Sequence, residues 1–573
     1  MDLTWFVINF VVTEKSKESI CLTSKALLSY RTKAIHNSIL ILSIPLLLSA
    51  FTHLWNPAGF PAIHPDEGTY MRRTMHALEG LGVQDPSSQF DHTQTSNSSF
   101  DHPYFGQMFL VSIFSIIGYP DFSNVFVNSS IQPIEILYMT PRILMGFLAV
   151  IDTFLVYKIA SRLYGSKVAL VASILFSVMP LSWILRRIVL DTIALPLILT
   201  SIYFMISYVT NNSEHNNYRD TKRLGKGEEI TRMNSNSHNI LLILLSGIFL
   251  GLAAFTKIPA LSVIPLMGFL LFFMIPSARS GKIFALWLTP ALLIPLIWPA
   301  YAISIGDLDE WLNGVLWQGS QRQGEGKTLV DIVNIFFKLD PVLFFLGIAG
   351  IVFAAIKKDF LPLVWSAPYI LLVYVVGWAT HFHWVLALPV FCIAAALLLL
   401  RLSQLLLRTR NTKVVRLIPY IVVSSICIFA ITSTVVLITS NLSLAQYQAA
   451  AYVRQEINNG INNPTIISSP VYSWIFKYVL DKDNIFAHIR DSLQPIKTKD
   501  ILLITDSTFH HVLSNVGEDK KQIELIKTIY NNRTYPIASF RDTVIAYDTK
   551  NYPYINMREA DIGGGQVIVQ ANY

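Results

Sequence analysis

Long apolar runs alternate with short polar loops between residues 38 and 440. Each run is about long enough to cross about 30 Å of hydrocarbon as an α-helix. The pattern predicts about eleven transmembrane helices, at residues 38–54, 141–160, 168–184, 190–208, 239–256, 258–276, 283–303, 341–356, 361–378, 384–400 and 416–439. We therefore expect a polytopic α-helical membrane protein.

The pattern changes after Leu442, where a helix-like stretch at 445–457 precedes short β-branched or apolar runs. These runs lie at residues 465–469, 501–505 and 543–547. Alternation of helix-like and strand-like segments predicts a small α/β soluble domain. The tail contains neither GxGxxG nor GxxxxGK, so we interpret its GGG run at 563–565 as a turn or flexible tail.

The content of Lys and Arg in the loops predicts the orientation, because basic residues are retained on the cytoplasmic side. If segment 1–37 is cytoplasmic, five basic loops are cytoplasmic as well, at residues 161–167, 218–232, 278–282, 357–358 and 401–416. An odd number of spans then puts the tail outside. We expect a cytoplasmic segment 1–37, a transmembrane domain 38–440 with a long external loop 55–140, and an extracytoplasmic domain 441–573.

Composition agrees with a multi-pass protein of the cell membrane or an endomembrane. Of the 573 residues, 53% are hydrophobic and 14% charged, and the mean hydropathy is +0.47, values that are rare among soluble proteins. The net charge of +7 follows from the cytoplasmic loops and does not indicate nucleic acid. Cys21, Cys392 and Cys427 are far apart and predict neither a disulfide framework nor a zinc site. Sequons at Asn97, Asn128, Asn441 and Asn532 fall outside in this topology.

The first external loop begins with two adjacent carboxylates, Asp66 and Glu67, in the stretch HPDEGTYMRR. After Pro65 they suit the first turn of a helix, whose dipole favours negative charge, so a structural role is one interpretation. The polar residues of later external segments favour a second one, because they would face the same side of the membrane. These residues are His102, Arg187, Asp191, Lys257, His381 and His383.

Several of these residues have structural alternatives. Arg187 runs against the positive-inside bias and should have an ionic partner, which we expect to be Asp191 at i+4. Lys257 could instead snorkel from a helix end to the interface. His381 and His383 could bind a metal or line a pocket, and the lack of a third ligand favours the pocket. Asp152, near the middle of a predicted span, indicates a buried partner or a water-filled cavity.

Together these motifs resemble the GT-C superfamily of membrane glycosyltransferases, in the branch of dolichyl-phosphate-mannose protein mannosyltransferases and lipid A aminoarabinose transferases. The match consists of Asp66-Glu67 soon after the first span, the Arg187 and Asp191 pattern, Lys257 at the start of a later span, and the stretch DHPYFG at 101–106. That stretch keeps the family's His-Pro but replaces the next two residues by Tyr104 and Phe105. The resemblance covers roughly residues 38–400.

The resemblance implies transfer of a sugar from a polyprenyl (dolichyl) phosphate donor to a protein, lipid or glycan acceptor on the non-cytoplasmic face. We expect Asp66 to be the general base, and Lys257 and Arg187 to hold the leaving phosphate. Glu67 would position the loop against Arg72 or Arg73, and His102, Asp191, His381 and His383 would contact substrate. One base without a second carboxylate nucleophile predicts inversion, although Glu67 leaves a double displacement formally open. We predict no resident metal site, with a divalent cation left open.

A transporter or a flippase for lipid-linked sugars is the alternative from another class, since eleven spans and Asp152 would suit one. Against it, the chain shows no inverted repeat with paired broken helices, and its polar residues cluster near one face. An oligosaccharyltransferase acting on Asn is a third hypothesis. The tail lacks the WWD-type acceptor motif that such enzymes carry.

Overall fold

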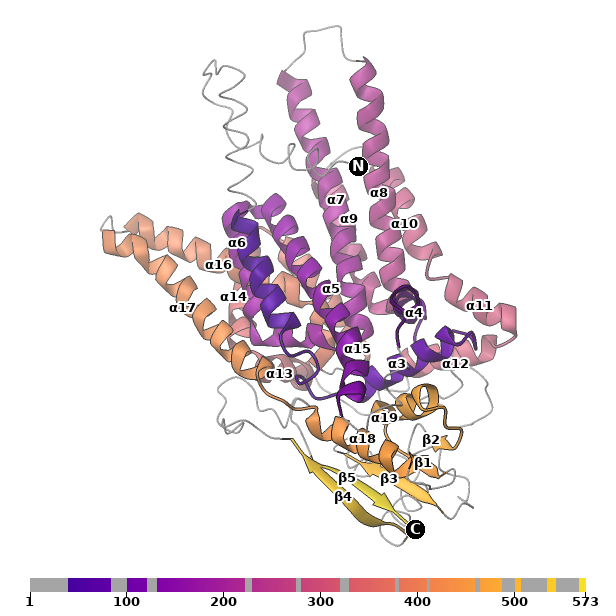
Figure 1. Ribbon diagram of the computed structural model, residues 1–573. Helices are drawn as coiled ribbons and strands as arrows, with labels where there is room; N and C mark the ends of the chain where they lie inside the picture. The colour runs from indigo at the N-terminus through magenta and orange to yellow at the C-terminus, as the bar shows by residue number, and fades with distance from the viewer. Residues whose placement is uncertain are drawn as a thin grey trace, which may run out of the picture.

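A helical bundle makes up most of the molecule, and a small β-sheet lies at one end of it (Figure 1). The computed structural model describes residues 40–83, 100–120, 131–221, 229–274, 280–319, 329–376, 381–409, 413–458, 464–486, 500–506, 533–542 and 566–572. Segment 1–37, Cys21, the sequons at Asn97, Asn128 and Asn532, the run 543–547 and the GGG run lie outside these residues.

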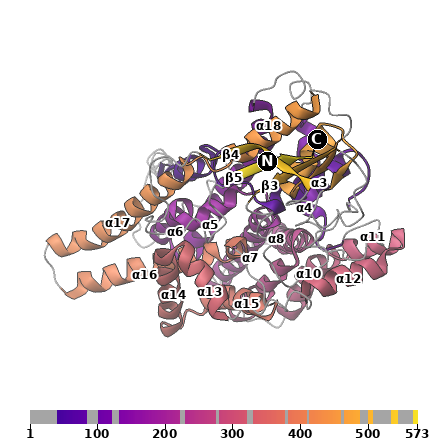
Figure 2. The same ribbon diagram turned by 90° about the horizontal axis from the view of Figure 1, so that it is seen from below.

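The bundle begins with the helix Leu40–Leu54 and continues through helices of very different length. Its members are α5 (Gln132–Tyr164), α6 (Ser166–Val178), η2 (Pro180–Arg186), α7 (Leu190–Thr221), α8 (Glu229–Thr256), η3 (Ile258–Val263), α9 (Ile264–Met274), α10 (Ser280–Leu293), α11 (Ile297–Ile305), α14 (Pro341–Ile356), α15 (Leu361–Val376), η5 (His381–Leu386), α16 (Leu388–Thr409) and α17 (Lys413–Ile438). Seen from below, α16 and α17 project together on one side, and α11 with α12 (Leu308–Gly319) on the other (Figure 2).

Five helices of the described chain are long and apolar enough to cross a membrane. They are Gln132–Tyr164, Leu190–Asn212, Asn239–Thr256, Ser280–Ile305 and Ile421–Ile438, and the bent pair α6 and η2 makes a sixth if it is counted as one span. Five more of the predicted spans coincide with apolar helices of 10–17 residues, at Leu40–Leu54, Ile258–Met274, Pro341–Ile356, Leu361–Val376 and Leu388–Ser403. The helical bundle is therefore confirmed, and the count of eleven spans stays a prediction.

The predicted span 168–184 is bent by 68° between α6 and η2. Met179 has an extended backbone (φ −65°, ψ 138°), as expected for a residue before proline, and Pro180 supplies no N–H to continue the helix. The chain then runs through the 3₁₀ helix η2 to Arg187, which is also extended. The bend thereby brings Arg186 and Arg187 onto an irregular segment before α7.

The C-terminal sheet has the strand order β2-β1-β3-β5-β4. Its strands are β1 (Thr465–Ile467), β2 (Ile485–Phe486), β3 (Ile501–Thr505), β4 (Tyr535–Arg541) and β5 (Gln566–Ala571). β1 is parallel to both of its neighbours, whereas β5 is antiparallel to β3 and β4. Helix α18 (Leu444–Asn458) packs on β4 and β5. The helix predicted at 445–457 and the strands predicted within 465–469 and 501–505 are thus confirmed.

The C-terminal part packs against α3 (Pro65–Leu78), the helix that carries the two adjacent carboxylates. A Cβ on Gly68 would lie 2.1 Å from the carbonyl oxygen of Pro470, so α3 and α19 (Pro470–Trp474) touch backbone to backbone. The Gln446 side chain accepts a hydrogen bond from Ile63 N at 2.8 Å and donates one to Ile63 O at 3.0 Å. The tail therefore holds the segment before α3 as well as α3 itself.

Candidate active site

The N-terminus of α3 fixes the position of Asp66. His64 is the N-cap, and its Nδ1 accepts a hydrogen bond from Asp66 N at 3.2 Å. In return Glu67 Oε1 accepts one from His64 N at 3.0 Å, which completes a capping box, and Pro65 occupies the first helical turn. The Asp66 side chain is 25% exposed. It therefore has a defined position and access to solvent or a ligand.

Glu67 is completely buried and faces the bundle. Arg142 forms a bidentate pair with it, Nη2 to Oε1 at 2.8 Å and Nε to Oε2 at 2.9 Å, and Arg187 Nη1 lies 3.2 Å from Oε1. Burial opposes ionisation, but the two arginines hold the pKa of Glu67 below its ordinary value. The expectation that Glu67 pairs with Arg72 or Arg73 was wrong. Glu67 faces the interior of the bundle, where its partners come from α5 (Arg142) and from the segment before α7 (Arg187). The arginine expected to need an ionic partner, Arg187, does have one.

Asp191 pairs with Lys257 rather than with Arg187. Its Oδ2 lies 2.5 Å from Lys257 Nζ, which is 5.3 Å from the centre of the Phe382 ring. The expected i+4 pair with Arg187 did not form because Arg187 precedes α7 on extended chain, whereas Asp191 lies in the first turn of the helix. Lys257 is only 6% exposed, so it does not snorkel to the surface.

A second bidentate pair joins α3 to the start of the DHPYFG stretch. Arg73 Nη1 lies 2.8 Å from Asp101 Oδ1, Arg73 Nη2 donates to Asp101 Oδ2 at 2.9 Å, and His102 Nδ1 lies 3.5 Å from Oδ2. Burial opposes ionisation of Asp101, but Arg73 and His102 hold its pKa well below the ordinary value. Arg73 and Asp101 were not among the site residues predicted from the sequence, although Asp101 directly precedes the His-Pro of the motif.

His381 and His383 face different surroundings. The His381 ring stacks on Trp183 at 5.5 Å and is buried, whereas His383 stacks on Phe382 at 4.8 Å and lines a cavity. The described residues contain no group of three or more His, Cys, Asp or Glu side chains that could hold a metal ion. Only His383 therefore belongs to the wall of the candidate site.

The cavity has a volume of about 710 Å³ and combines a charged region with an apolar wall. Its charged or titratable residues are Asp66, Tyr70, Arg73, Asp101, His102, Lys257, Tyr369 and His383. Apolar residues from η3, α10, α11, α12, α15 and η5 form the rest, among them Pro259, Leu261, Leu292, Leu296, Trp298, Trp311, Val315, Val373 and Phe382. Of the eight sequence-predicted site residues, Asp66, His102, Lys257 and His383 line it. Glu67, Arg187, Asp191 and His381 lie behind it.

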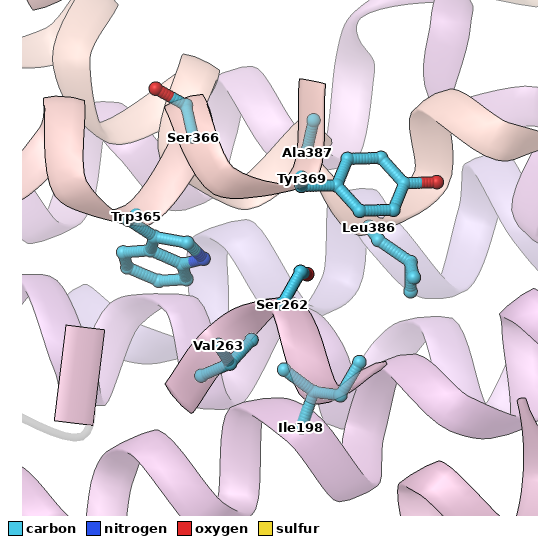
Figure 3. Close-up of a pocket in the computed structure, with 8 residues that line it drawn as sticks. All are labelled: Ile198, Ser262, Val263, Trp365, Ser366, Tyr369, Leu386 and Ala387. Atoms are coloured by element: carbon cyan, nitrogen blue, oxygen red, sulfur yellow. The ribbon is translucent and has the colours of Figure 1, made fainter. Parts of the chain in front are cut away.

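A second, much smaller cavity of about 10 Å³ lies between α7, η3, α15 and the end of η5 (Figure 3). Its polar residues come from two elements, Ser262 from η3 and Ser366 and Tyr369 from α15. Such a volume holds about one water molecule and no substrate. Tyr369 lines both cavities, and its hydroxyl donates to the carbonyl oxygen of His383, which ties α15 to the wall of the larger cavity.

Comparisons with known proteins agree with this architecture. The family model described as dolichyl-phosphate-mannose-protein mannosyltransferase matches residues 136–218, from α5 into α7. ArnT from Cupriavidus metallidurans, solved with bound undecaprenyl phosphate, is 11% identical over 93% of this chain and 98% of its own, with a TM-score of 0.52. The chain has the GT-C fold. The fold expected from the sequence resemblance is therefore confirmed.

Other proteins with the GT-C fold match less completely. The oligosaccharyltransferase AglB from Archaeoglobus fulgidus, in complex with an inhibitory peptide and a dolichol-phosphate, is 12% identical over 81% of this chain and 69% of its own, with a TM-score of 0.50. Another structure of the A. fulgidus oligosaccharyltransferase, tethered to an acceptor peptide, is 13% identical over 79% of this chain, with a TM-score of 0.49. The chain spans 64% of that protein's length. No curated protein matches the chain by sequence.

Proposed function

We propose that this protein is a membrane glycosyltransferase that takes a sugar from a polyprenyl phosphate and transfers it to an acceptor hydroxyl. The observation that carries the proposal is the cavity of about 710 Å³, in which Asp66 and Lys257 share one wall with a long apolar surface. A polyprenyl-phosphate sugar has matching parts: an apolar chain, a phosphate and a polar ring. The polyprenyl phosphates bound to ArnT and AglB support the same donor class.

Asp66 is the proposed general base. The other two aspartates nearby already form ion pairs, Asp101 with Arg73 and Asp191 with Lys257. Asp66 has instead a partly exposed carboxylate on the cavity wall, and His64 Nδ1 lies 3.8 Å from it, beyond hydrogen-bond distance. A positioned carboxylate that takes the proton of an acceptor hydroxyl typically contributes about 10² to 10⁴ in rate. Because Glu67 lies behind the wall, a single displacement with inversion follows from this assignment.

Lys257 is the proposed ligand of the donor phosphate. Asp191 holds its ammonium group at the wall, and the ion pair offsets the cost of burying the charge. An ammonium has three N–H donors, so pairing with Asp191 leaves donors for a phosphate. His102 and the Arg73–Asp101 pair contribute to the same region of the cavity. Arg187, which pairs with buried Glu67, acts through that pair on the position of α3 rather than on the phosphate.

The acceptor is proposed to be a protein, lipid or glycan on the non-cytoplasmic face. The matched family model names protein mannosylation, which makes dolichyl-phosphate mannose the first donor to test. Helix α3, which carries Asp66, packs against α19 of the C-terminal part, which agrees with the expectation that both lie on one side of the membrane.

The test is transfer of labelled sugar by purified protein in nanodiscs. We expect wild-type protein to move label from dolichyl-phosphate mannose, or from another polyprenyl-phosphate sugar, to a protein, lipid or glycan acceptor. Asp66→Asn should lower turnover by about 10²-fold or more while the protein still binds dolichyl phosphate. A flippase would instead move the intact lipid-linked sugar across vesicle bilayers. Wild-type turnover by folded Asp66→Asn protein would contradict the base assignment.

A further inference from the structure

Tyr70 lies on the cavity wall one turn of α3 after Asp66. The residue is 6% exposed, and its ring meets the His102 ring edge to face at 6.2 Å. Among the residues that the structure describes, its hydroxyl has no hydrogen-bond partner. The hydroxyl oxygen is not sealed inside the protein but is accessible from the cavity, where a ligand can reach it. The position therefore suits a group that makes its hydrogen bond with a ligand in the cavity.

The surroundings of Tyr70 keep its phenol protonated. Burial raises the pKa of Tyr70 well above its ordinary value, and the nearby carboxylates Asp66, Asp191 and Asp101 raise it further against the opposing effect of Arg73. The phenol is thus a neutral hydrogen-bond donor near neutral pH. It cannot compete with Asp66 for the role of base.

We infer that the Tyr70 hydroxyl is a catalytic hydrogen-bond donor to the phosphate oxygen that leaves the anomeric carbon. The inference rests on the proposed function. Cβ atoms four residues apart on a helix face are about 5–6 Å apart. An attacking oxygen starts about 3–3.5 Å from the carbon that it attacks, and the leaving oxygen lies one bond beyond that carbon. Asp66 and Tyr70 therefore lie on one face of α3 and line the same cavity, where they can serve the two ends of one in-line displacement.

In this step the bond from the acceptor oxygen to the anomeric carbon forms as the bond from that carbon to the phosphate oxygen breaks. The acceptor proton goes to Asp66, and the electron pair of the broken bond stays on the phosphate. The Tyr70 proton is shared in a hydrogen bond and is not transferred, because a phosphate monoester is already a stable leaving anion. Lys257 balances the charge of the phosphate as a whole, whereas Tyr70 acts on the oxygen whose charge grows.

Tyr70→Phe tests the inference, because phenylalanine keeps the ring packed on His102 and removes only the hydroxyl. We expect kcat for a polyprenyl-phosphate sugar to fall about 10- to 100-fold. Affinity for dolichyl phosphate should change by less than about threefold, because the hydrogen bond strengthens only as charge develops. The same binding measurement shows that the variant is folded. Tyr104→Phe is the matched control, since Tyr104 lies on the same loop region but does not line the cavity.

The outcomes separate this inference from the proposed function. Wild-type kcat in Tyr70→Phe protein would overturn the role of Tyr70 and leave the transferase intact. A loss confined to dolichyl phosphate affinity, with kcat unchanged, would overturn it as well, because it would make Tyr70 a ground-state contact. The acid limb of the pH profile should be the same in wild type and Tyr70→Phe, and a shifted limb would mean that the Tyr70 hydroxyl acts on the pKa of the base rather than on the leaving oxygen. Absence of transfer by wild-type protein would contradict the proposed function itself.

Discussion

Two neighbouring carboxylates on α3 have opposite surroundings. Asp66 faces the cavity and is partly exposed, whereas Glu67 is fully buried between Arg142 and Arg187. Successive residues of a helix are about 100° apart around its axis, so one side chain can face a ligand while the next enters the bundle. Proximity in sequence therefore does not give the two residues one role.

Replacing Glu67 by Gln should mainly cost stability. The change leaves two buried arginines without their carboxylate, which typically costs about 3–5 kcal/mol. The thermal unfolding temperature in detergent should fall clearly, whereas the exposed control Glu79→Gln should leave it unchanged. Because the folded pKa of Glu67 is depressed, its contribution is complete above the unfolded pKa of about 4.3 and is lost as the pH falls through the lower folded value. An unchanged unfolding temperature at pH 7 would refute this role.

Lys257 should act on the donor. Lys257→Ala is expected to weaken donor binding or turnover by about 1.5–3 kcal/mol, the range typical of a charge-assisted hydrogen bond, and Lys257→Arg should restore part of the loss. Kinetics and dolichyl phosphate binding measure both effects, with Lys167→Ala at an exposed position in the first turn of α6 as the control. Unchanged binding and turnover in Lys257→Ala protein would make the Asp191 pair purely structural.

At the scale of elements, α3 depends on a close contact with α19. A methyl group at Gly68 would overlap the Pro470 carbonyl, and since both partners are backbone, the two helices would have to separate. Gly68→Ala should therefore destabilise the protein by about 1–3 kcal/mol and lower transfer activity. Gly281→Ala is the matched control, because a Cβ at Gly281 meets no atom within 4 Å. Thermal unfolding of the two variants gives the comparison, and equal stability would contradict the importance of the contact.

Local sequence patterns predicted many of the helices and strands. They did not predict which residues pair with one another over long distances in the sequence. The runs 465–467 and 501–505 became strands because short β-branched stretches have few other stable conformations. The pairing of Glu67 with Arg142 joins residues 75 positions apart, and nothing in the sequence near Glu67 indicates it. The same holds for the bend at Pro180: a proline inside an apolar run was visible, but its effect on the pairing of Arg187 was not.

The whole molecule has a predicted orientation that labelling can test. In a variant without its three natural cysteines, we would introduce Lys167→Cys in the first turn of α6 or Arg541→Cys on β4, both exposed positions. If the protein lies in the cell membrane, an impermeant thiol reagent applied to intact cells should label only the cysteine at position 541, because basic loops stay in the cytoplasm. If it lies in an endomembrane, sealed microsomes should show the reverse, with labelling at position 541 only after permeabilisation. Labelling of both positions from the same side of a sealed membrane would reject this topology.

The strand order of the sheet determines how much of the chain must be synthesised before the sheet is complete. β5 is the last of the five strands along the chain, yet it lies between β3 and β4, so these two strands are joined to each other only through β5. The sheet in turn supports α18 and α19, which hold Ile63 and Gly68 on either side of Asp66. A chain that ends before residue 566 would have every residue of the cavity wall but would lack the strand that joins β3 to β4 and that packs against α18.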